Sequence, residues 1–345
     1  MVVAQFVAMF KARTMEFVRD KGTFAWNLLF PVLLVFGLSF AFSGGDDRLF
    51  KIGVAGAGEK PAILDMDQML IVEYADVSEA LLKLERRQID MVVDLDSREY
   101  SINGESNKGR LLKELFTSQQ LAASVPHGRG EQDSSSGFAE RMVEGRGTRY
   151  VDWLVPGVIG MNMMFSSLFG VGYVIVRYRK NGVLKRFKAT PVHALNFVGA
   201  QAASRLVIVL ATSVFVYIGT NFFLGFIMRG SYIHLLLTTA LAILCMIALG
   251  LVFAARMRSE ELAGGVLNLV TFPMLALSGV FFSLEGSPPI LRTISLAFPL
   301  THFTDAARKI MLDGAGLVQI LPNLLVLGGL TALFLILGAA LFKWE

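Results

Sequence analysis

The first residues that could do chemistry are a group of glycines followed by a lysine. The stretch KIGVAGAG at residues 51–58 comes shortly before Lys60, an arrangement that invites comparison with the loop that binds nucleotide phosphates in ATPases. In that loop the lysine follows a glycine directly, and the next residue is a Ser or Thr that binds magnesium. Here Glu59 separates the glycine from the lysine, and Pro61 replaces the hydroxyl residue. The sequence therefore predicts a turn at the end of a strand, and a chain without a nucleotide-binding motif that does not hydrolyse ATP itself.

The other residues that could bind a metal or attack a substrate are too scattered to do so. The histidines show no ligand spacing; they are His127, His193, His234 and His302. The single cysteine, Cys245, lies in the middle of an apolar stretch, so no intrachain disulfide is possible and a small core residue is predicted. The apolar stretches contain no pair of acids, no His-x-x-x-His and no Ser nucleophile with a basic partner. The sequence predicts no catalytic residues, no metal and no cofactor in this chain.

The strongest concentration of charge is a loop at residues 177–194. It carries six basic residues and no acid between them; they are Arg177, Arg179, Lys180, Lys185, Arg186 and Lys188. Long apolar stretches flank this loop on both sides. Lysine and arginine close to the ends of membrane spans are retained in the cytoplasm. The loop is therefore predicted to face the cytoplasm, and its charges could serve topology alone.

The composition is that of a polytopic membrane protein. Hydrophobic residues make up 54% of the chain, 27 residues are Phe, and the mean hydropathy is +0.57. A hydrocarbon core about 30 Å thick needs roughly 20 apolar residues of helix to cross it. Six stretches qualify: 23–42, 151–176, 195–228, 232–255, 262–284 and 317–342. We expect an all-α membrane protein with six transmembrane helices.

Counting spans outward from the basic loop places the other segments. With that loop inside, both termini lie in the cytoplasm and residues 43–150 lie outside. Residues 1–22 have an apolar side and a basic side, which predicts an amphipathic helix in the cytoplasmic interface; an extension of the first span is the alternative. They do not resemble a cleavable signal peptide, so the first span is expected to act as an uncleaved anchor.

Residues 43–150 differ from the rest of the chain in charge and pattern. They contain 14 basic and 19 acidic residues, a balance of −5, whereas the remainder carries +9. Strands and helices alternate: strand 51–58, helix 60–70, strand 71–76, helix 77–89, strand 90–96, strand 98–103 and helix 108–125. This order predicts a small α/β extracytoplasmic domain inserted between spans one and two. Residues 126–148 are rich in Gly, Ser and charge, which predicts a mobile linker.

The remaining residues, 151–345, are predicted to form a five-helix transmembrane region. Within it, residues 285–316 are too apolar for a free loop and too interrupted for a span. Pro288-Pro289 and Pro299 divide them into two short helices of about a dozen residues each. We expect an outer re-entrant hairpin packed against protein; two amphipathic helices on the outer surface are the alternative.

Several polar residues lie inside the predicted spans. Asn162, Asn221 and Asn268 either line a substrate path or form hydrogen bonds between helices. Arg205, near the cytoplasmic end of the third span, is expected to extend toward lipid headgroups. The basic pI of about 9.2 arises from residues beside the spans, where membrane lipid and the positive-inside rule account for it, so no nucleic-acid partner is predicted.

Two stretches resemble the permease subunits of ATP-binding-cassette type-2 exporters. The first is NGVLKRFKATPV at residues 181–192, and the second is FPMLALSGVFFSLEGSPPILRTISLAFPLTHFTDAARKIML at residues 272–312. The second contains the recurring elements of the family's fifth-span segment: Leu277-Ser278-Gly279, Phe281-Phe282 with Glu285, Pro299-Leu300-Thr301 and Asp305-Ala306-Ala307-Arg308. The large insert after the first span is similar to that of one branch of the family, and the resemblance covers all six spans in order.

This resemblance implies a transport mechanism with named sites. Two permeases would pair, as a homodimer or with a sister permease, and each would bind a cytoplasmic ATPase subunit that holds ATP and magnesium. The ATPase-coupling residues would be Gly182, Val183, Leu184, Lys185, Arg186, Phe187, Thr190 and Pro191. Of these, Val183, Leu184 and Phe187 would seat in a groove of the ATPase, while Lys185 and Arg186 meet acids on its rim. The outer gate or re-entrant region would comprise Ser278, Gly279, Glu285, Pro299, Thr301, Asp305 and Arg308.

The predicted function is export of a drug, lipid or lipid-linked molecule across the cell membrane, in a prokaryote the inner membrane. The 15 Met and 27 Phe residues could furnish an adaptable apolar cavity for such a substrate. The alternative is a membrane-anchored extracytoplasmic sensor or assembly factor, in which the insert binds a ligand and the spans serve as an anchor. Six spans and an outer hairpin are more than an anchor requires, which favours the permease.

Overall fold

The computed structural model describes residues 2–42, 50–58, 61, 64, 69–85, 88–103, 106–123, 138–143, 150–189, 194–257, 259–284 and 287–341. The chain divides into two compact units. The first is helical and comprises residues 1–37, 154–282 and 289–345. The second comprises residues 38–153 and 283–288 and contains the sheet.

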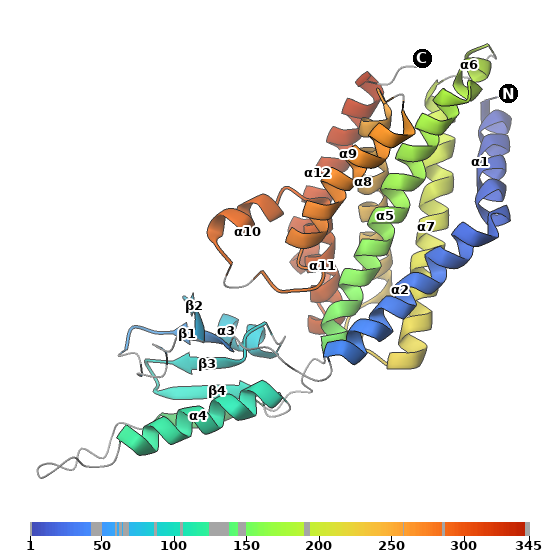
Figure 1. Ribbon diagram of the computed structural model, residues 1–345. Helices are drawn as coiled ribbons and strands as arrows, with labels where there is room; N and C mark the ends of the chain where they lie inside the picture. The colour runs from blue at the N-terminus through green and yellow to red at the C-terminus, as the bar shows by residue number, and fades with distance from the viewer. Residues whose placement is uncertain are drawn as a thin grey trace, which may run out of the picture. The chain divides into compact units, whose positions relative to one another are not determined.

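The long helices of the helical unit follow the predicted spans closely (Figure 1). They are α2 (Lys21–Phe42), α5 (Tyr150–Lys180), α7 (Ala194–Leu224), α8 (Tyr232–Ala254), α9 (Glu260–Leu277) and α12 (Leu317–Leu341). By length and composition, α5, α7, α8, α9 and α12 can cross a membrane. The first helix, α1 (Val2–Arg19), joins α2 at a 61° bend, and this pair is a sixth candidate span if it is counted as one. The structure is that of a polytopic membrane protein, as predicted.

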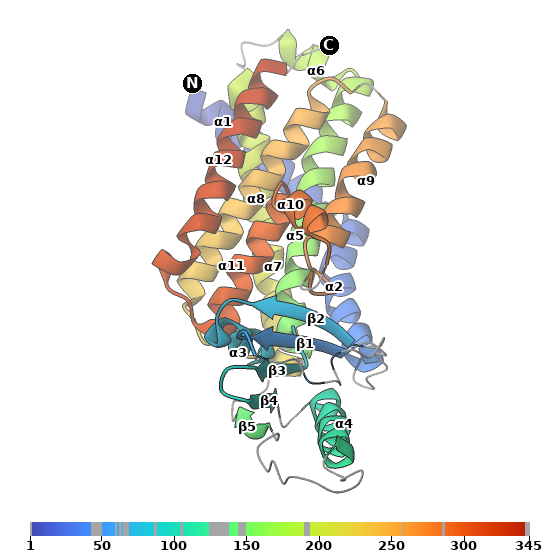
Figure 2. The ribbon, with the colours of Figure 1, turned by 90° about the vertical axis from the view of Figure 1, so that its left-hand side faces the viewer.

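Helix α8 lies in the middle of the helical unit. It packs against α7, α9, α11 and α12, and Figure 2 shows it beside α11 and α12. It meets α5 at Gly172 and Gly250, where the absence of side chains allows the two backbones to approach closely. A Cβ atom added at Gly250 would lie 3.2 Å from the carbonyl oxygen of Leu168. The small residues at this contact therefore bring the backbones of α5 and α8 close together.

Two predicted spans were too long at their C-terminal ends. The third, predicted to reach residue 228, ends at Leu224, and Gly225 follows with a positive φ of 51°. The fifth, predicted to reach residue 284, ends at Leu277, and Gly279 has a φ of 67°. Glycine adopts this left-handed conformation readily, and a residue in this conformation ends a right-handed helix. Hydropathy missed both ends because the residues that follow them are still apolar.

The region between α9 and α12 forms two helices, as predicted, but of unequal length. They are α10 (Pro289–Ser295), with 7 residues, and α11 (Pro299–Asp313), with 15 residues. Pro299 occupies the first turn of α11, where its missing N–H costs nothing, and Gly314 ends that helix with a φ of 71°. The predicted equal lengths were wrong because these two signals give α11 four turns. Helix α11 is buried against α8, α9 and α12.

The second unit is a small α/β domain built on a five-stranded sheet. Its elements are β1 (Phe50–Ala55), β2 (Met69–Tyr74), α3 (Val77–Glu85), β3 (Met91–Asp94), β4 (Glu99–Asn103), α4 (Asn107–Ala123) and β5 (Ala139–Val143). The strand order is β2-β1-β3-β4-β5. Strand β1 pairs parallel with β2 and β3, and β4 pairs antiparallel with β3 and parallel with β5. The core contains Ile52, Met91 and Ile102 from the strands and Leu112 and Phe116 from α4.

Two local predictions in this domain were wrong. Residues 139–143 were predicted as part of a mobile linker, but they form β5, which pairs with β4. An ion pair between Lys113 and Glu140 at 2.7 Å and the contact of Phe138 with Phe116 hold the strand in place. The strand was not predicted because the residues around it in the sequence are rich in Gly and Ser. Met69 and Leu70, predicted to end a helix, begin β2. The remainder of the predicted linker, residues 126–137 and 144–148, lies outside the described residues.

The glycine-rich stretch forms the predicted turn after β1. Gly56 has a φ of 92°, and the N–H of Ala57 donates to the Asp96 carboxylate at 3.0 Å. A Cβ atom added at Gly58 would lie 2.5 Å from the carbonyl oxygen of Leu95. One backbone donor of this turn is thus already bound to a carboxylate.

Candidate functional site

The predicted coupling loop contains a short helix, α6 (Val183–Lys188), directly after α5. Gly182 separates the two helices with a φ of 69°. Lys185 and Arg186 are exposed, whereas the side chain of Leu184 is 0% exposed. The prediction that Leu184 seats in the groove of a partner is therefore wrong, because this side chain is buried within its own chain. Phe187 lies in α6, and the predicted Thr190 and Pro191 lie outside the described residues.

Arg179 ties the base of α6 to the end of α8. Its guanidinium group, in a residue 9% exposed, donates to the carbonyl oxygens of Ala254 at 2.9 Å and Ala255 at 3.0 Å. It also donates to the carbonyl oxygen of Met257. The last carbonyls of a helix lack partners within it and carry the negative end of its dipole, so a cation is well placed here. In the sequence Arg179 is one charge of a basic loop, and no local pattern indicates this structural role.

Lys180 makes a second link, from the end of α5 to the start of α9. Its Nζ lies 3.5 Å from a carboxylate oxygen of Glu260. Arg179 and Lys180 thus join the end of α5 to the end of α8 and to the start of α9. Figures 1 and 2 show α6 at the same end of the helical unit as the start of α1 and the end of α12. A force applied at α6 would therefore reach α5 directly and α8 and α9 through these contacts.

Helix α1 is attached to α5 and α7 by polar contacts at the same end. Arg13 donates to the carbonyl oxygen of Gly170 at 3.2 Å and pairs with Glu16 at 2.8 Å. The hydroxyl of Tyr178 donates to Glu16 at 2.6 Å. The hydroxyls of Thr14 and Ser204 share a further hydrogen bond of 2.8 Å. The helix predicted to lie in the interface thus packs against protein with both polar and apolar residues, since Arg13 and Phe17 are buried, while Val3, Val7 and Val18 are exposed.

The prediction that Arg205 extends to lipid headgroups was wrong. Its side chain turns into the helical unit, and its Nε donates to the carbonyl oxygen of Ser166 at 2.7 Å. The guanidinium carbon lies 5.3 Å from the centre of the Phe17 ring, a cation–π distance. Gly170 leaves the space that this guanidinium group fills, because an added Cβ atom would overlap it. No local sequence pattern indicates this space, because it depends on how α1, α5 and α7 pack.

Four of the predicted outer residues meet where α9 ends and α11 begins. The Thr301 hydroxyl donates to the Ser278 hydroxyl at 3.0 Å, and Arg308 donates to the carbonyl oxygen of Gly279 at 2.6 Å. Thr304, which was not predicted, donates to the carbonyl oxygen of Ser278 at 2.9 Å. These bonds satisfy the backbone of the turn that ends α9. They fix the turn against α11, and Pro299 begins that helix.

The other predicted outer residues lie apart from this cluster. Asp305 pairs with Lys309 at 2.6 Å and accepts a hydrogen bond from Asn323 at 2.8 Å, which links α11 to α12. Glu285 lies outside the described residues. The predicted outer residues thus form two separate contacts. One joins α11 to the end of α9, and the other joins α11 to α12.

The three asparagines of the predicted spans do not form one path. Asn162 donates to the carbonyl oxygen of Asn27 at 3.0 Å, and Ser166 donates to the side-chain oxygen of Asn27 at 2.7 Å. These bonds join α2 to α5, which fits the interhelical alternative for Asn162. Asn221 is half-buried and Asn268 is exposed. A substrate path through these residues stays a prediction.

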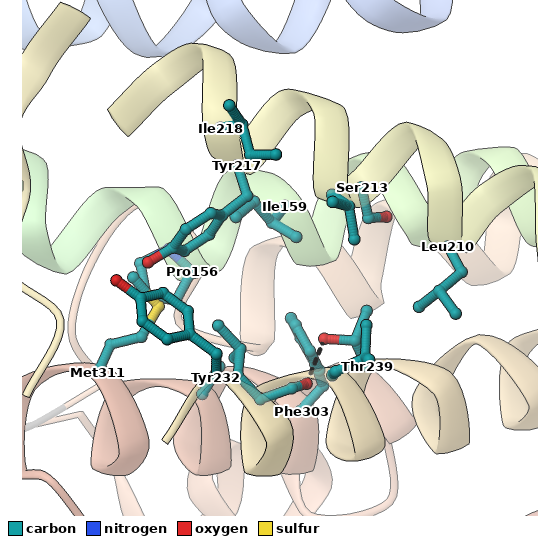
Figure 3. A pocket seen from close by; sticks show the side chains of 14 residues that line it. Pro156, Ile159, Leu210, Ser213, Tyr217, Ile218, Tyr232, Thr239, Phe303 and Met311 are labelled. Atoms are coloured by element: carbon teal, nitrogen blue, oxygen red, sulfur yellow. Dashed lines mark hydrogen bonds between the residues drawn. The ribbon is translucent and has the colours of Figure 1, made fainter. Parts of the chain in front are cut away.

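A pocket of about 350 Å³ lies between α5, α7, α8 and α11 (Figure 3). One stripe of α7 lines it at helical spacing: Leu210, Ser213, Val214, Tyr217 and Ile218. Facing residues include Ile159 of α5, Leu236 of α8 and Phe303 of α11. None of the three asparagines lines it. The α7 stripe could not be recognised as a pocket wall in the sequence, because the same pattern also fits a helix that faces lipid. Among the described residues, no group of three His, Cys, Asp or Glu side chains could hold a metal ion.

Comparison with known proteins relates the sequence to transporter permeases. The inner membrane transport permease YhhJ of Escherichia coli is 25% identical over 183 residues, which cover 53% of this chain and 49% of YhhJ. The daunorubicin resistance ABC transporter permease protein DrrB1 of Streptomyces coeruleorubidus is 27% identical over 200 residues, 56% of this chain and 69% of DrrB1. ABC transporter G family member 20 of Dictyostelium discoideum is 22% identical over 346 residues, 92% of this chain and 47% of that protein.

These relatives share a family but differ in extent. The chain spans about half the length of YhhJ and of the Dictyostelium protein. The family profile described as ABC-2 family transporter protein matches residues 21–340, which include every long helix from α2 to α12 except the last residue of α12. With the candidate spans and the short helix that follows α5, this match shows that the chain belongs to the ABC-2 family of transporter permeases.

Proposed function

We propose that this chain is the membrane permease of an ABC exporter, driven by a separate ATPase. ATP and magnesium would be bound by that ATPase, because the glycine-rich stretch after β1 lacks the glycine-lysine pair and the following hydroxyl residue of a phosphate-binding loop. The chain would work as a pair, either with a second copy or with a sister permease, and would move a drug, lipid or lipid-linked molecule outward. The relatives support this class, since DrrB1 is named as a resistance permease of an ABC transporter.

The observation that carries the proposal is the construction of α6. Helix α6 exposes two cations, Lys185 and Arg186, while its Leu184 side chain is buried within the chain. Acidic residues on an ATPase would be attracted to this cationic surface and set the orientation of the complex. Arg179 and Lys180, at the base of α6, would then pass movement of the ATPase to α8 and α9. Because Leu184 is buried, α6 would move together with the helical unit.

Charge reversal on α6 tests the proposal. Lys185→Glu combined with Arg186→Glu is expected to remove the ATPase from affinity-purified complexes, with at least a tenfold loss of bound ATPase, because two attractive pairs become repulsive. Both side chains are exposed, so the fold should be retained. The measurement is the amount of ATPase that co-purifies from native membranes with the tagged permease.

Arg256→Glu is the matched control. Arg256 is also an exposed cation, at the turn between α8 and α9, and it lies outside α6. We expect this variant to retain most of the bound ATPase. Equal retention in the α6 variant and the control would contradict the coupling role. A ligand-binding sensor without an ATPase partner would bring down no ATPase even in the unaltered form.

A further inference from the structure

Residues 283–288 connect α9 to α10 but fold with the α/β domain. They belong to the unit that contains the sheet, whereas α9 and α10 on either side of them belong to the helical unit. Lys51, on β1, donates from Nζ to the carbonyl oxygen of Ser283 at 3.5 Å. The N–H of Ser287 donates to the carbonyl oxygen of Leu284 at 3.1 Å, which closes a turn within the segment. The chain therefore leaves the helical unit after residue 282, contacts the α/β domain and returns at residue 289.

The helix that follows this segment has few contacts that fix its position. Helix α10 has 7 residues, all of them described, and of these only Ser295 is buried. Isolated helices shorter than about 12–15 residues are marginal in water. Two of its apolar side chains, Ile290 and Ile294, are exposed, so their burial does not hold it in place. Apart from its packing against α9, α10 therefore depends on what its two ends are attached to.

The two ends of α10 are attached to different units of the chain. Leu296 directly follows α10, and its carbonyl oxygen accepts a hydrogen bond of 2.8 Å from Nε2 of His302 on α11. The last carbonyls of a helix lack partners within it, so this bond joins the end of α10 to α11. The other end continues into residues 283–288, which Lys51 contacts. Helix α10 thus has one attachment in the helical unit and one in the α/β domain.

The turn that precedes the segment is fixed firmly within the helical unit. Two side chains of α11 donate to carbonyl oxygens of residues 278 and 279, at 2.9 and 2.6 Å. A Cβ atom added at Gly157 of α5 would lie 2.5 Å from the carbonyl oxygen of Val280. The turn therefore moves with α5 and α11. The residues after it, from 283 onward, are the part of the connection whose position depends on the α/β domain.

From these contacts we propose that residues 283–296 form a regulatory strap, through which the α/β domain controls the position of α10. While Lys51 holds the start of the strap, α10 stays ordered between its two attachments. When the domain releases residues 283–288, α10 loses one attachment and becomes mobile, whereas the 278–280 turn stays in place. The coupling is reciprocal, because a free energy that links two sites acts equally in both directions. The strap needs no ATPase, so it can fail or hold independently of the export proposal.

Amide hydrogen exchange, measured by mass spectrometry on the purified full chain in nanodiscs, tests the strap. Lys51→Met removes the donor to Ser283 and keeps an unbranched side chain. We expect the amides of residues 283–296 to exchange about fivefold faster, the effect of one net hydrogen bond. Exchange in α11 should not change. An increase confined to residues 283–288 would overturn the proposal, because α10 would then not depend on the α/β domain.

Lys113→Met is the matched control. Lys113 is a lysine of the same domain, but it pairs with Glu140 on β5 at 2.7 Å. This variant loses an ion pair of the domain and should leave exchange in residues 283–296 unchanged. Equal exchange of the strap in the Lys51 and Lys113 variants would contradict the proposed control of α10.

A covalent bridge provides the opposite change. Lys51→Cys and Ser283→Cys are introduced into a chain in which Cys245, the free cysteine, is replaced by alanine. Before bridging, residues 289–296 should exchange as fast as in Lys51→Met. A bifunctional maleimide that joins the two cysteines should return their exchange to the rate of the unaltered chain or below it. A bridged chain in which α10 still exchanges fast would overturn the proposal, since the domain would then hold residue 283 without ordering α10.

The reverse direction is tested from the helical unit. His302→Ala removes the attachment of Leu296 to α11, and by reciprocity it should also accelerate exchange in residues 283–288. Exchange in residues 303–313 reports whether α11 itself stays folded in this variant. Unchanged exchange in residues 283–288, with α11 folded, would show that the strap transmits nothing and would overturn the proposal.

Discussion

Arg179→Ala is expected to lower the free energy of unfolding by about 2–4 kcal/mol, because it leaves the buried carbonyl groups of Ala254 and Ala255 without a donor. The loss includes the favourable position of a cation at the C-terminal end of α8. In thermal unfolding of the purified chain, the midpoint should fall by several degrees. If the export proposal is correct, transport should also fall, because α6 would no longer move together with α8.

Lys180→Ala provides the comparison at the adjacent position. The pair between Lys180 and Glu260 is 3.5 Å long, and the lysine side chain is 52% exposed. Pairs of this kind contribute about 0–1 kcal/mol. Arg179→Lys should fall between the two, because an ammonium group keeps the charge but loses the planar set of donors. If both alanine variants unfolded at the same temperature, Arg179 would not have the structural role assigned to it here.

Gly157→Ala is expected to destabilise the helical unit by about 1–3 kcal/mol, the usual effect of overpacking. An added Cβ atom would lie 2.5 Å from the carbonyl oxygen of Val280 and 3.0 Å from its Cα atom. These are backbone atoms, so no side-chain rotation can relieve the overlap. The turn at Ser278–Val280 would have to move, and with it the hydrogen bonds from Thr304 and Arg308. Thermal unfolding of the purified variant measures the effect.

Gly328→Ala in α12 controls for the change of residue type. No atom lies within 4 Å of a Cβ added there, and helical alanine is favoured over glycine by roughly 0.5–1 kcal/mol. The control should therefore unfold at the same temperature or slightly higher. A Gly157→Ala variant that matched Gly328→Ala would show that α5 does not approach the 278–280 turn as closely as described.

The membrane spans could be predicted from sequence because their physical requirement is simple. A span needs about 20 apolar residues of helix, and each predicted stretch overlaps most of one of the long helices. Where apolar residues continued past a helix end, the boundary was missed, as at Gly225 and Gly279. Pro299 and Gly314, which mark the two ends of α11, can be recognised in the sequence. The end of α10 at Ser295 is not marked by such a residue.

The orientation of individual side chains could not be predicted in the same way. Leu184 sits on the apolar side of a six-residue helix, and sequence cannot tell whether that side meets its own chain or a partner. Arg205 could reach outward to headgroups or inward to a carbonyl group, and the space left by Gly170 decides for the inward position. The pocket arises from the packing of four helices, which no local pattern encodes. Strand β5 depends on pairing with a distant strand.

The most direct test of the proposed mechanism is the side of the membrane on which α6 lies. Lys185→Cys, in a chain whose buried Cys245 is replaced by alanine, can be treated with a membrane-impermeant maleimide. Glu79→Cys, on the exposed side of α3, reports on the inserted domain. We predict that the cysteine at 185 reacts in inside-out vesicles and not in intact cells, and that the cysteine at 79 shows the opposite pattern. Reaction at 185 in intact cells would contradict the account, because a helix outside the cell cannot contact a cytoplasmic ATPase.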